Sequence, residues 1–195
     1  MKVLFIGGTG NISSYVSKLL LEKGFDLYLL NRGNIKLDLP GANYFKGDIR
    51  NKEEIIKILS NQKFDVVVDW IAFIVDHVEF DYELFEERGK AIYFYKQCFY
   101  LSKTPSTPYI TESTPLKKPY WQYSRDKIAC EDFLRKKYRE NDFPITIVRP
   151  SHTYNTIFPI ISPGSNNYTF IDRIKKGMWF NWKYPFNRSS ISYYI

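Results

Sequence analysis

The sequence predicts an α/β fold with a doubly wound parallel sheet. Continuous apolar runs of strand length alternate with segments that carry apolar residues at helical spacing. This alternation is typical of βαβ units, in which a helix connects parallel strands and ligands bind at the carboxyl ends of the strands. The predicted strands are residues 3–6, 25–30, 42–45, 64–68 and 145–148, and helical spacing follows over 12–20, 52–61 and 128–134.

The first predicted strand runs directly into a glycine-rich turn, residues 7–13, which reads Gly-Gly-Thr-Gly-Asn-Ile-Ser. Glycine adopts backbone angles that other residues resist, and it lets a phosphate approach the amide groups of a helix N-terminus, where the dipole favours an anion. The predicted ligand is a dinucleotide pyrophosphate; the alternative is a plain β-to-α turn. Ser13 replaces the usual glycine or alanine and is small enough for close packing. The predicted binding residues are Gly7, Gly8, Thr9, Gly10, Asn11 and Ile12.

Length and composition favour one folded domain, with the start of a second. The chain has 195 residues, of which 44% are hydrophobic. Cys98 and Cys130 suggest neither a disulfide framework nor a metal site. Met1 and Lys2 lead straight into the first strand, and no apolar run is long enough to span a bilayer, so we expect a cytoplasmic protein without a membrane partner.

The net charge of +7 is concentrated in two stretches. Residues 91–104 and 178–195 each contain two basic residues and no acidic one, so together they carry four of the seven charges. The rest of the chain is only mildly basic, which makes nucleic acid an unlikely partner.

Several polar residues follow the predicted strands. Asn31 and Arg32 stand where dinucleotide folds meet the adenosine ribose; an acid there selects NAD, whereas an arginine accommodates the 2′-phosphate of NADP. The cofactor prediction is therefore NAD(P), leaning towards NADP, with a merely solvated arginine as the alternative. Asp48 with Ile49, and Ala72, are further candidates for cofactor binding at strand ends.

Tyr123 and Lys127 form the second chemical motif. They are four residues apart at the start of a predicted helix and therefore share one helical face. A nearby ammonium lowers the pKa of a tyrosine, which can then exchange a proton with a hydroxyl or carbonyl group near neutral pH. The alternative is a solvent-facing pair of a kind that many helices carry.

Taken together, these motifs resemble the extended short-chain dehydrogenase/reductase family, in particular its NAD-dependent epimerase/dehydratase group. The resemblance covers roughly residues 1–177. It rests on four motifs in the family's order: the glycine turn at 7–13, Gly-Asp-Ile-Arg at 47–50, the Tyr123/Lys127 pair, and Arg-Pro-Ser-His-Thr-Tyr at 149–154.

The resemblance implies a Rossmann-like NAD(P)-binding domain over residues 1–150 and the start of a substrate-binding region over 151–195, atypical after 177. It implies that Tyr123 is the catalytic acid/base, that Lys127 is catalytic and holds the nicotinamide ribose, and that Asp48 faces the adenine. The implied reaction is a transient hydride transfer on a sugar nucleotide or similar hydroxylated substrate. A homodimer is a further implication.

Two stretches depart from the family pattern. Where the family has a strand followed by a serine turn, the turn position here holds Lys96-Gln97-Cys98, and Ser102 comes several residues late. With suitable codons, residues 92–104 read one base later give YIFISSASIYQKP, a family-like strand and serine turn. We therefore hypothesise compensating frameshifts, which the nucleotide sequence tests. Residues 178–195 show no family motif, which suggests a truncated or frameshifted terminus.

These observations leave three candidate functions. The leading interpretation is an NAD(P)-dependent protein of the epimerase/dehydratase type, impaired in catalysis if the serine is missing. The second is an RNA-binding protein on the same fold, and the third is a dinucleotide sensor without chemistry. Weak RNA affinity that falls steeply with salt favours the second, and tight NADP binding without turnover favours the third.

Overall fold

A computed structural model of the chain describes residues 1–10, 12–34, 39–86, 111, 122–150 and 175–177, and the backbone of residues 92–95. The chain divides into two compact units, Met1–Thr156 and Ile157–Ile195, and the fold below is that of the first. The roles expected for residues 1–150 and 151–195 stay predictions. Asn11, the turn at 96–98, Ser102, the motif residues 151–154 and the tail at 178–195 lie outside the described residues.

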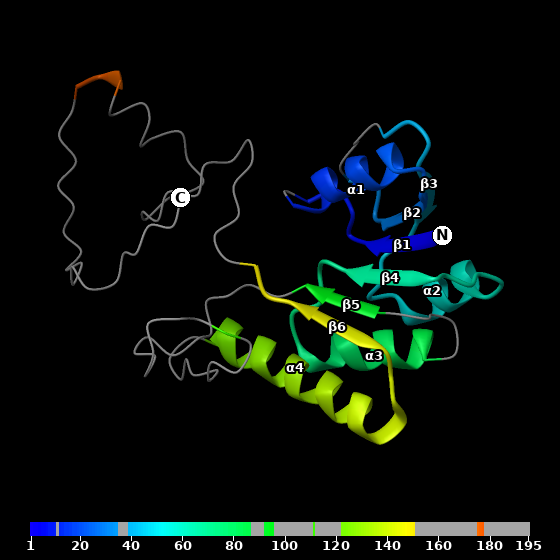
Figure 1. The fold of residues 1–195 in the computed structure, drawn as a ribbon, viewed down its shortest axis with the longest axis vertical. Helices are drawn as coiled ribbons and strands as arrows, with labels where there is room; N and C mark the ends of the chain where they lie inside the picture. Colours follow the sequence, from blue (N-terminus) through cyan, green and yellow to red (C-terminus); the bar gives the residue numbers. More distant parts are fainter. Residues whose placement is uncertain are drawn as a thin grey trace. The chain divides into compact units, whose positions relative to one another are not determined.

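Six strands form one sheet in the order β3-β2-β1-β4-β5-β6, and every neighbouring pair is parallel (Figure 1). The chain proceeds from β1 towards one edge and then from β4 towards the other. The resulting switch point between β1 and β4 is where open α/β sheets bind ligands. The strands are β1 (Lys2–Ile6), β2 (Asp26–Asn31), β3 (Asn43–Lys46), β4 (Val66–Asp69), β5 (Ile92–Tyr95) and β6 (Ile145–Val148).

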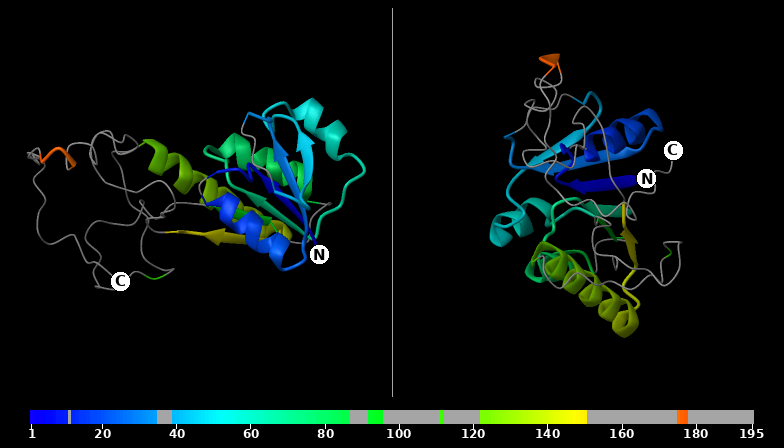
Figure 2. Two further views of the ribbon diagram at one scale, coloured as in Figure 1. Left: turned by 90° about the horizontal axis from the view of Figure 1, so that it is seen from above. Right: turned by 90° about the vertical axis from the view of Figure 1, so that its left-hand side faces the viewer.

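Helices cover both faces of this sheet, as the doubly wound prediction requires (Figure 2). On one face, Val3 and Phe5 of β1 belong to the core beneath α1; on the other, Leu4 and Ile6 belong to the core shared with α2, α3 and α4. Successive side chains of a strand point to opposite faces, so the apolar run of β1 fills both cores. The helices are α1 (Ser13–Glu22), α2 (Lys52–Leu59), α3 (Val75–Phe85) and α4 (Gln122–Asn141).

The predicted strands and the first two predicted helices form within a residue or two of their expected bounds. Helix α4 is longer than the predicted spacing over residues 128–134. Helix α3 was not predicted. In α1 the fully buried residues are Ser13 and Ser17, and of the apolar residues in the predicted helical spacing Val16 and Leu20 pack against the core, whereas Leu19 is 48% exposed. The hydroxyl of Ser17 donates to the carbonyl of Gly8 at 3.2 Å, so the helix presents its small polar side to the glycine turn.

Strand β5 forms from the first four residues of 92–104, the stretch that departs from the family pattern. Its backbone pairs with β4 on one side and β6 on the other. The residues as given, without any change of reading frame, therefore join the two neighbouring strands. Among the helices that the structure describes, none has the length and apolar character needed to cross a membrane.

Candidate dinucleotide-binding site

The glycine turn has no room for side chains at its first two positions. Gly7 has a φ of +82°, and a Cβ added there would lie 2.5 Å from Cγ2 of Ile71. A Cβ at Gly8 would lie 2.4 Å from Cδ2 of Leu29. Both distances are shorter than the contacts that real Cβ atoms make, so a side chain at either position would have to push aside a methyl group of Ile71 or Leu29. At Gly7 the positive φ adds backbone strain for any other residue.

Ser13, the first residue of α1, holds the glycine turn in place through two hydrogen bonds. Its hydroxyl accepts a hydrogen bond from the amide of Gly10 at 2.8 Å and donates one to the carbonyl of Gly7 at 3.1 Å. Ser13 is 2% exposed, and both bonds are partly buried. A serine at this position therefore does more than provide close packing: it closes the loop on itself.

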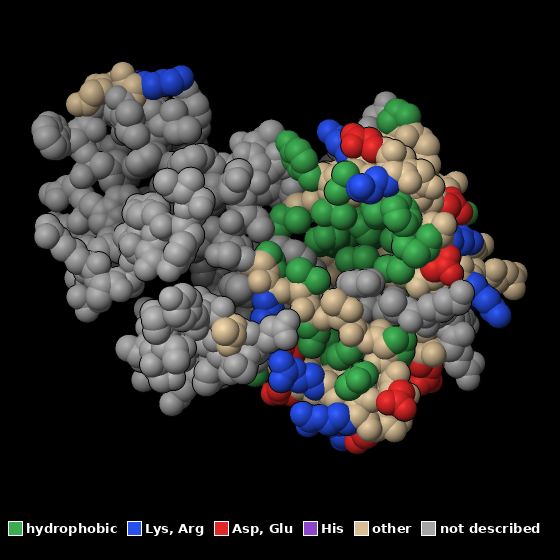
Figure 3. Space-filling model, in the orientation of Figure 1, with side chains coloured by type: hydrophobic (Ala, Val, Ile, Leu, Met, Phe, Trp, Pro, Cys, Tyr) green, Lys and Arg blue, Asp and Glu red, His purple; other side chains and the backbone are tan. Residues whose placement is uncertain are grey.

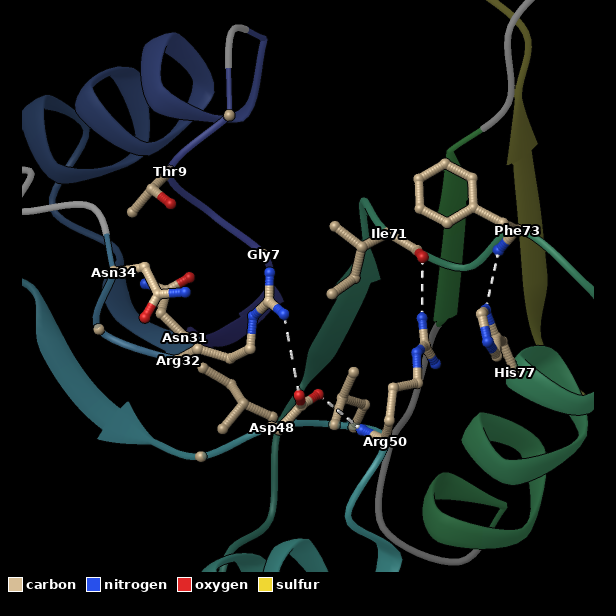
Figure 4. A pocket seen from close by; sticks show the side chains of 15 residues that line it. Gly7, Thr9, Asn31, Arg32, Asn34, Asp48, Arg50, Ile71, Phe73 and His77 are labelled. Carbon is tan, nitrogen blue, oxygen red and sulfur yellow. Dashed lines mark hydrogen bonds and ion pairs between the residues drawn. The ribbon is translucent and has the colours of Figure 1, made fainter.

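A pocket of about 380 Å³ opens beside the turn, at the carboxyl ends of β1 to β4 (Figure 4). It lies at the switch point of the sheet. Its lining brings together seven of the twelve residues expected to bind a cofactor. These are Gly7, Thr9, Gly10, Asn31, Arg32, Asp48 and Ile49.

The other expected cofactor residues lie around the pocket rather than on its wall, apart from Asn11, which is outside the described residues. Gly8, Ala72 and Lys127 are buried, and Ile12 is half-buried at the start of α1. Ala72 lies between Ile71 and Phe73, which both line the pocket.

Arg32 and Asp48, the two charged residues expected at the adenosine end of the cofactor, face each other in the pocket lining. Nη1 of Arg32 lies 4.0 Å from Oδ2 of Asp48, and their side chains are 66% and 41% exposed (Figure 4). Water screens a pair this exposed, so the guanidinium can turn to another anion at little cost.

Sequence reasoning missed four lining residues with side chains of consequence: Arg50, Ile71, Phe73 and His77. Nη2 of Arg50 donates to the carbonyl of Ile71 at 2.8 Å, and Nδ1 of His77 accepts from the amide of Phe73 at 3.1 Å. Ile71 and Phe73 could have been predicted to line the pocket because they follow a buried strand. His77 could have been predicted only if α3 had been predicted as a helix.

His77 is held neutral by its surroundings. Burial lowers the pKa of its imidazole, the nearby Arg50 and Lys127 cations lower it further, and the carboxylates of Asp69 and Asp76 offset part of this. A neutral ring has one unprotonated nitrogen, as the bond from the Phe73 amide requires.

Tyr123 and Lys127 lie on α4 beside the loop that follows β4. Lys127 is only 2% exposed, and its ammonium donates to the carbonyl of Ala72. Nζ of Lys127 lies 4.7 Å from the ring centroid of Phe73 and 5.8 Å from that of Tyr123. Lys127 is therefore not the solvent-facing lysine of the alternative interpretation. Phe73 contacts both residues and also lines the pocket, whose lining includes neither Tyr123 nor Lys127.

A buried ion pair holds α4 against the end of β6. Glu131 on α4 is completely buried, and both its carboxylate oxygens accept hydrogen bonds from the guanidinium of Arg149. Nη2 of Arg135, one turn along the helix, lies 2.7 Å from Oε1 of the same carboxylate. The described side chains contain no group of three or more His, Cys, Asp or Glu placed to hold a metal ion.

Comparison with known proteins gives one family and several partial relatives. The family model described as "NAD dependent epimerase/dehydratase family" matches residues 3–178. A UDP-glucose 4-epimerase of Lactobacillus helveticus is 37% identical over 76 residues, which are 37% of this chain and 23% of the relative. The chloroplast stem-loop binding protein of 41 kDa b of Arabidopsis thaliana is 26% identical over 170 residues, or 80% of this chain and 43% of the relative.

A solved structure has the same fold. The dTDP-glucose 4,6-dehydratase from Bacillus anthracis str. Ames, in complex with NAD, matches 91% of this chain with a TM-score of 0.71 and 19% sequence identity. This chain covers 62% of that protein. The chain thus spans less than half the length of the two curated relatives above and less than two thirds of the solved one.

Proposed function

We propose that this chain, which belongs to the NAD dependent epimerase/dehydratase family, binds a nicotinamide dinucleotide in the pocket beside its glycine turn. The observation that carries the proposal is the turn itself. Side chains are excluded at Gly7 and Gly8, and Ser13 holds the loop closed at the first turn of α1. A backbone cradle at a helix N-terminus suits a pyrophosphate.

The residues present fit such a cofactor. Gly7 to Gly10 and Ile12 would hold the pyrophosphate, Asn31, Arg32, Asp48 and Ile49 would face the adenosine end, and Ala72 and Lys127 would face the nicotinamide end. Support comes from the pocket, which runs from the ends of β2 and β3 to the loop after β4.

We propose that Tyr123 exchanges a proton with a substrate hydroxyl. The bound nicotinamide would supply hydride acceptance and return. The ammonium of Lys127, fixed by the Ala72 carbonyl one helical turn from Tyr123, favours the phenolate and so lowers the cost of the proton transfer. The proposed substrate is a sugar nucleotide, by analogy with the UDP-glucose and dTDP-glucose enzymes among the similar proteins.

Replacing Tyr123 by phenylalanine tests this chemistry, because only the hydroxyl is lost. With UDP-glucose or dTDP-glucose and either NAD or NADP, we expect the wild-type chain to produce a change in nicotinamide absorbance or an altered sugar. The Tyr123→Phe variant should lose this activity by about 100-fold or more while binding the cofactor as before. Equal activity in the variant would contradict the assignment, and cofactor binding without turnover by the wild type would favour a dinucleotide sensor.

We also propose that the pocket prefers NADPH to NADH, because Arg32 and Asn31 stand where NAD-selective folds place an acid. Arg32→Ala should weaken NADPH binding by about tenfold, or roughly 1.4 kcal/mol, and leave NADH binding nearly unchanged. Fluorescence titration measures both. Lys57→Ala, on the exposed side of α2, is the matched control for a lost positive charge. Equal weakening of the two cofactors would contradict the preference.

RNA binding is the second candidate function, and the similarity to a stem-loop binding protein over 80% of this chain favours it. Against it, acidic and basic side chains of the described residues are interspersed on the face drawn in Figure 3 rather than gathered in one basic stripe. Titration with a stem-loop RNA at two salt concentrations separates the cases, since phosphate contacts weaken steeply with salt. A homodimer and a cytoplasmic location remain predictions.

A further inference from the structure

The loop that follows β4 is shaped by the side chain of its first residue, Asp69. Asp69 is 1% exposed, and its Oδ1 accepts hydrogen bonds from the amides of Ile71 at 2.5 Å and Ala72 at 2.9 Å. These two bonds fold the chain back over the end of the strand. The course of the loop therefore depends on where this carboxylate is held.

The same loop positions the groups around the proposed cofactor pocket. The carbonyl of Ile71 accepts from Arg50, the carbonyl of Ala72 accepts from the ammonium of Lys127, and the amide of Phe73 donates to His77. The Ile71 side chain also lies where any side chain at Gly7 would collide with it. A change in the turn would move these contacts together.

A second carboxyl group is buried against Asp69 from the neighbouring helix. Asp81 on α3 is 4% exposed. Burial is the main reason that the pKa of Asp81 is raised well above its ordinary value, and the charge of Asp69 and a side-chain hydrogen bond between the two raise it further. Oδ2 of Asp69 and Oδ1 of Asp81 are both buried, and no N–H or O–H donor among the described residues reaches either atom.

We propose that Asp81 is a positioning residue of the dinucleotide site: its protonated carboxyl donates a hydrogen bond to Oδ2 of Asp69 and so fixes the Asp69–Phe73 turn. The pair then holds one proton and one negative charge. The inference rests on the proposed function, because the property that the turn is said to serve is cofactor binding.

Loss of this proton would place two negative charges side by side in the core. Arg50, from the loop after β3, favours the ionised form of Asp81 but does not outweigh burial and Asp69. His77 on α3 and Lys127 on α4 are the other titratable groups bonded to this turn, and Asp76 lies on α3 near His77. Alkaline pH should therefore release the turn and weaken cofactor binding.

The test compares Asp81→Asn, which keeps a hydrogen-bond donor without a titratable proton, with Asp81→Leu, which has none. Glu83→Gln changes an exposed acid on the same helix and is the matched control. NADH and NADPH affinities are measured by fluorescence from mildly acidic to alkaline pH. We expect wild type and Glu83→Gln to weaken together as pH rises and Asp81→Asn to stay constant. Asp81→Leu should bind about tenfold more weakly than Asp81→Asn at neutral pH.

Equal pH profiles for wild type and Asp81→Asn would overturn the proposal, as would equal affinities for the Asn and Leu variants.

Stability provides a readout that is independent of the cofactor and of whether the Leu variant folds. An acid whose folded-state pKa is raised loses stability as pH rises from about 3.9 towards that pKa. The stability advantage of Asp81→Asn over wild type should therefore grow with pH, and parallel stability curves would refute the shared proton. A folded wild type that binds no dinucleotide would overturn both the proposed function and the positioning role, whatever the stability curves show.

Discussion

Replacing Glu131 by alanine is expected to lower the free energy of unfolding by about 3–5 kcal/mol. The carboxylate is fully buried and pairs with Arg149 at the end of β6, whose side chain is only 15% exposed. Removing the carboxylate takes the counter-charge from a largely desolvated guanidinium, and that loss costs far more than the pair itself contributes. Denaturant-induced unfolding measures the change.

Asp132→Ala is the matched control, because Asp132 is the next residue of the same helix and is exposed. A surface substitution of this kind should change stability by less than about 0.5 kcal/mol. Similar losses in both variants would contradict the anchoring role of Glu131. Since α4 also carries Tyr123 and Lys127, a milder Glu131→Gln variant that folds should show whether this anchor affects the proposed proton transfer.

Placing a carboxylate in the glycine turn is expected to abolish dinucleotide binding. Among the described residues, a Cβ added at Gly10 would meet only the hydroxyl of Ser13, at 3.2 Å, so a side chain fits with a small adjustment. Gly10→Asp should therefore fold and repel the pyrophosphate. We expect a loss of affinity on the order of 100-fold or more, since juxtaposed like charges cost several kcal/mol.

Gly10→Asn controls for the size of the new side chain, and Gly10→Ala for the loss of glycine. We expect the alanine variant to bind within a few-fold of wild type and the asparagine variant to lie between the other two. Isothermal titration with NADH and NADPH gives the three affinities. If Asp and Asn weaken binding equally, bulk rather than charge is responsible, and the pyrophosphate assignment loses its support.

The sheet and the glycine turn could be predicted because their signals are local. A buried parallel strand is a continuous apolar run, and a glycine turn between a strand and a helix is visible within residues 2–20. In α1, Val16 and Leu20 pack against the core, but Leu19 of the same apolar pattern does not. Where Gly8 permits close approach, the small Ser17 faces the turn and Leu19 faces solvent.

The contacts that hold the loop after β4 beside the pocket could not be predicted, because they join segments far apart in the sequence. Arg50 reaches the Ile71 carbonyl, and Lys127 reaches the Ala72 carbonyl 55 residues away in the chain. The meeting of Asp69 with Asp81 likewise requires α3, whose apolar residues gave no helical prediction. Sequence spacing identifies Tyr123 and Lys127 as neighbours but does not reveal that both contact Phe73, which lines the pocket.

Titration of the wild-type chain with NADPH and with NADH, followed by nicotinamide fluorescence, tests whether the pocket beside the glycine turn binds a dinucleotide. We expect saturable binding of one molecule per chain, with NADPH bound more tightly, and competition by the corresponding oxidised cofactors. A folded chain that shows no saturable binding of either cofactor would contradict it, because the glycine turn and its pocket would then be a structural remnant without a ligand.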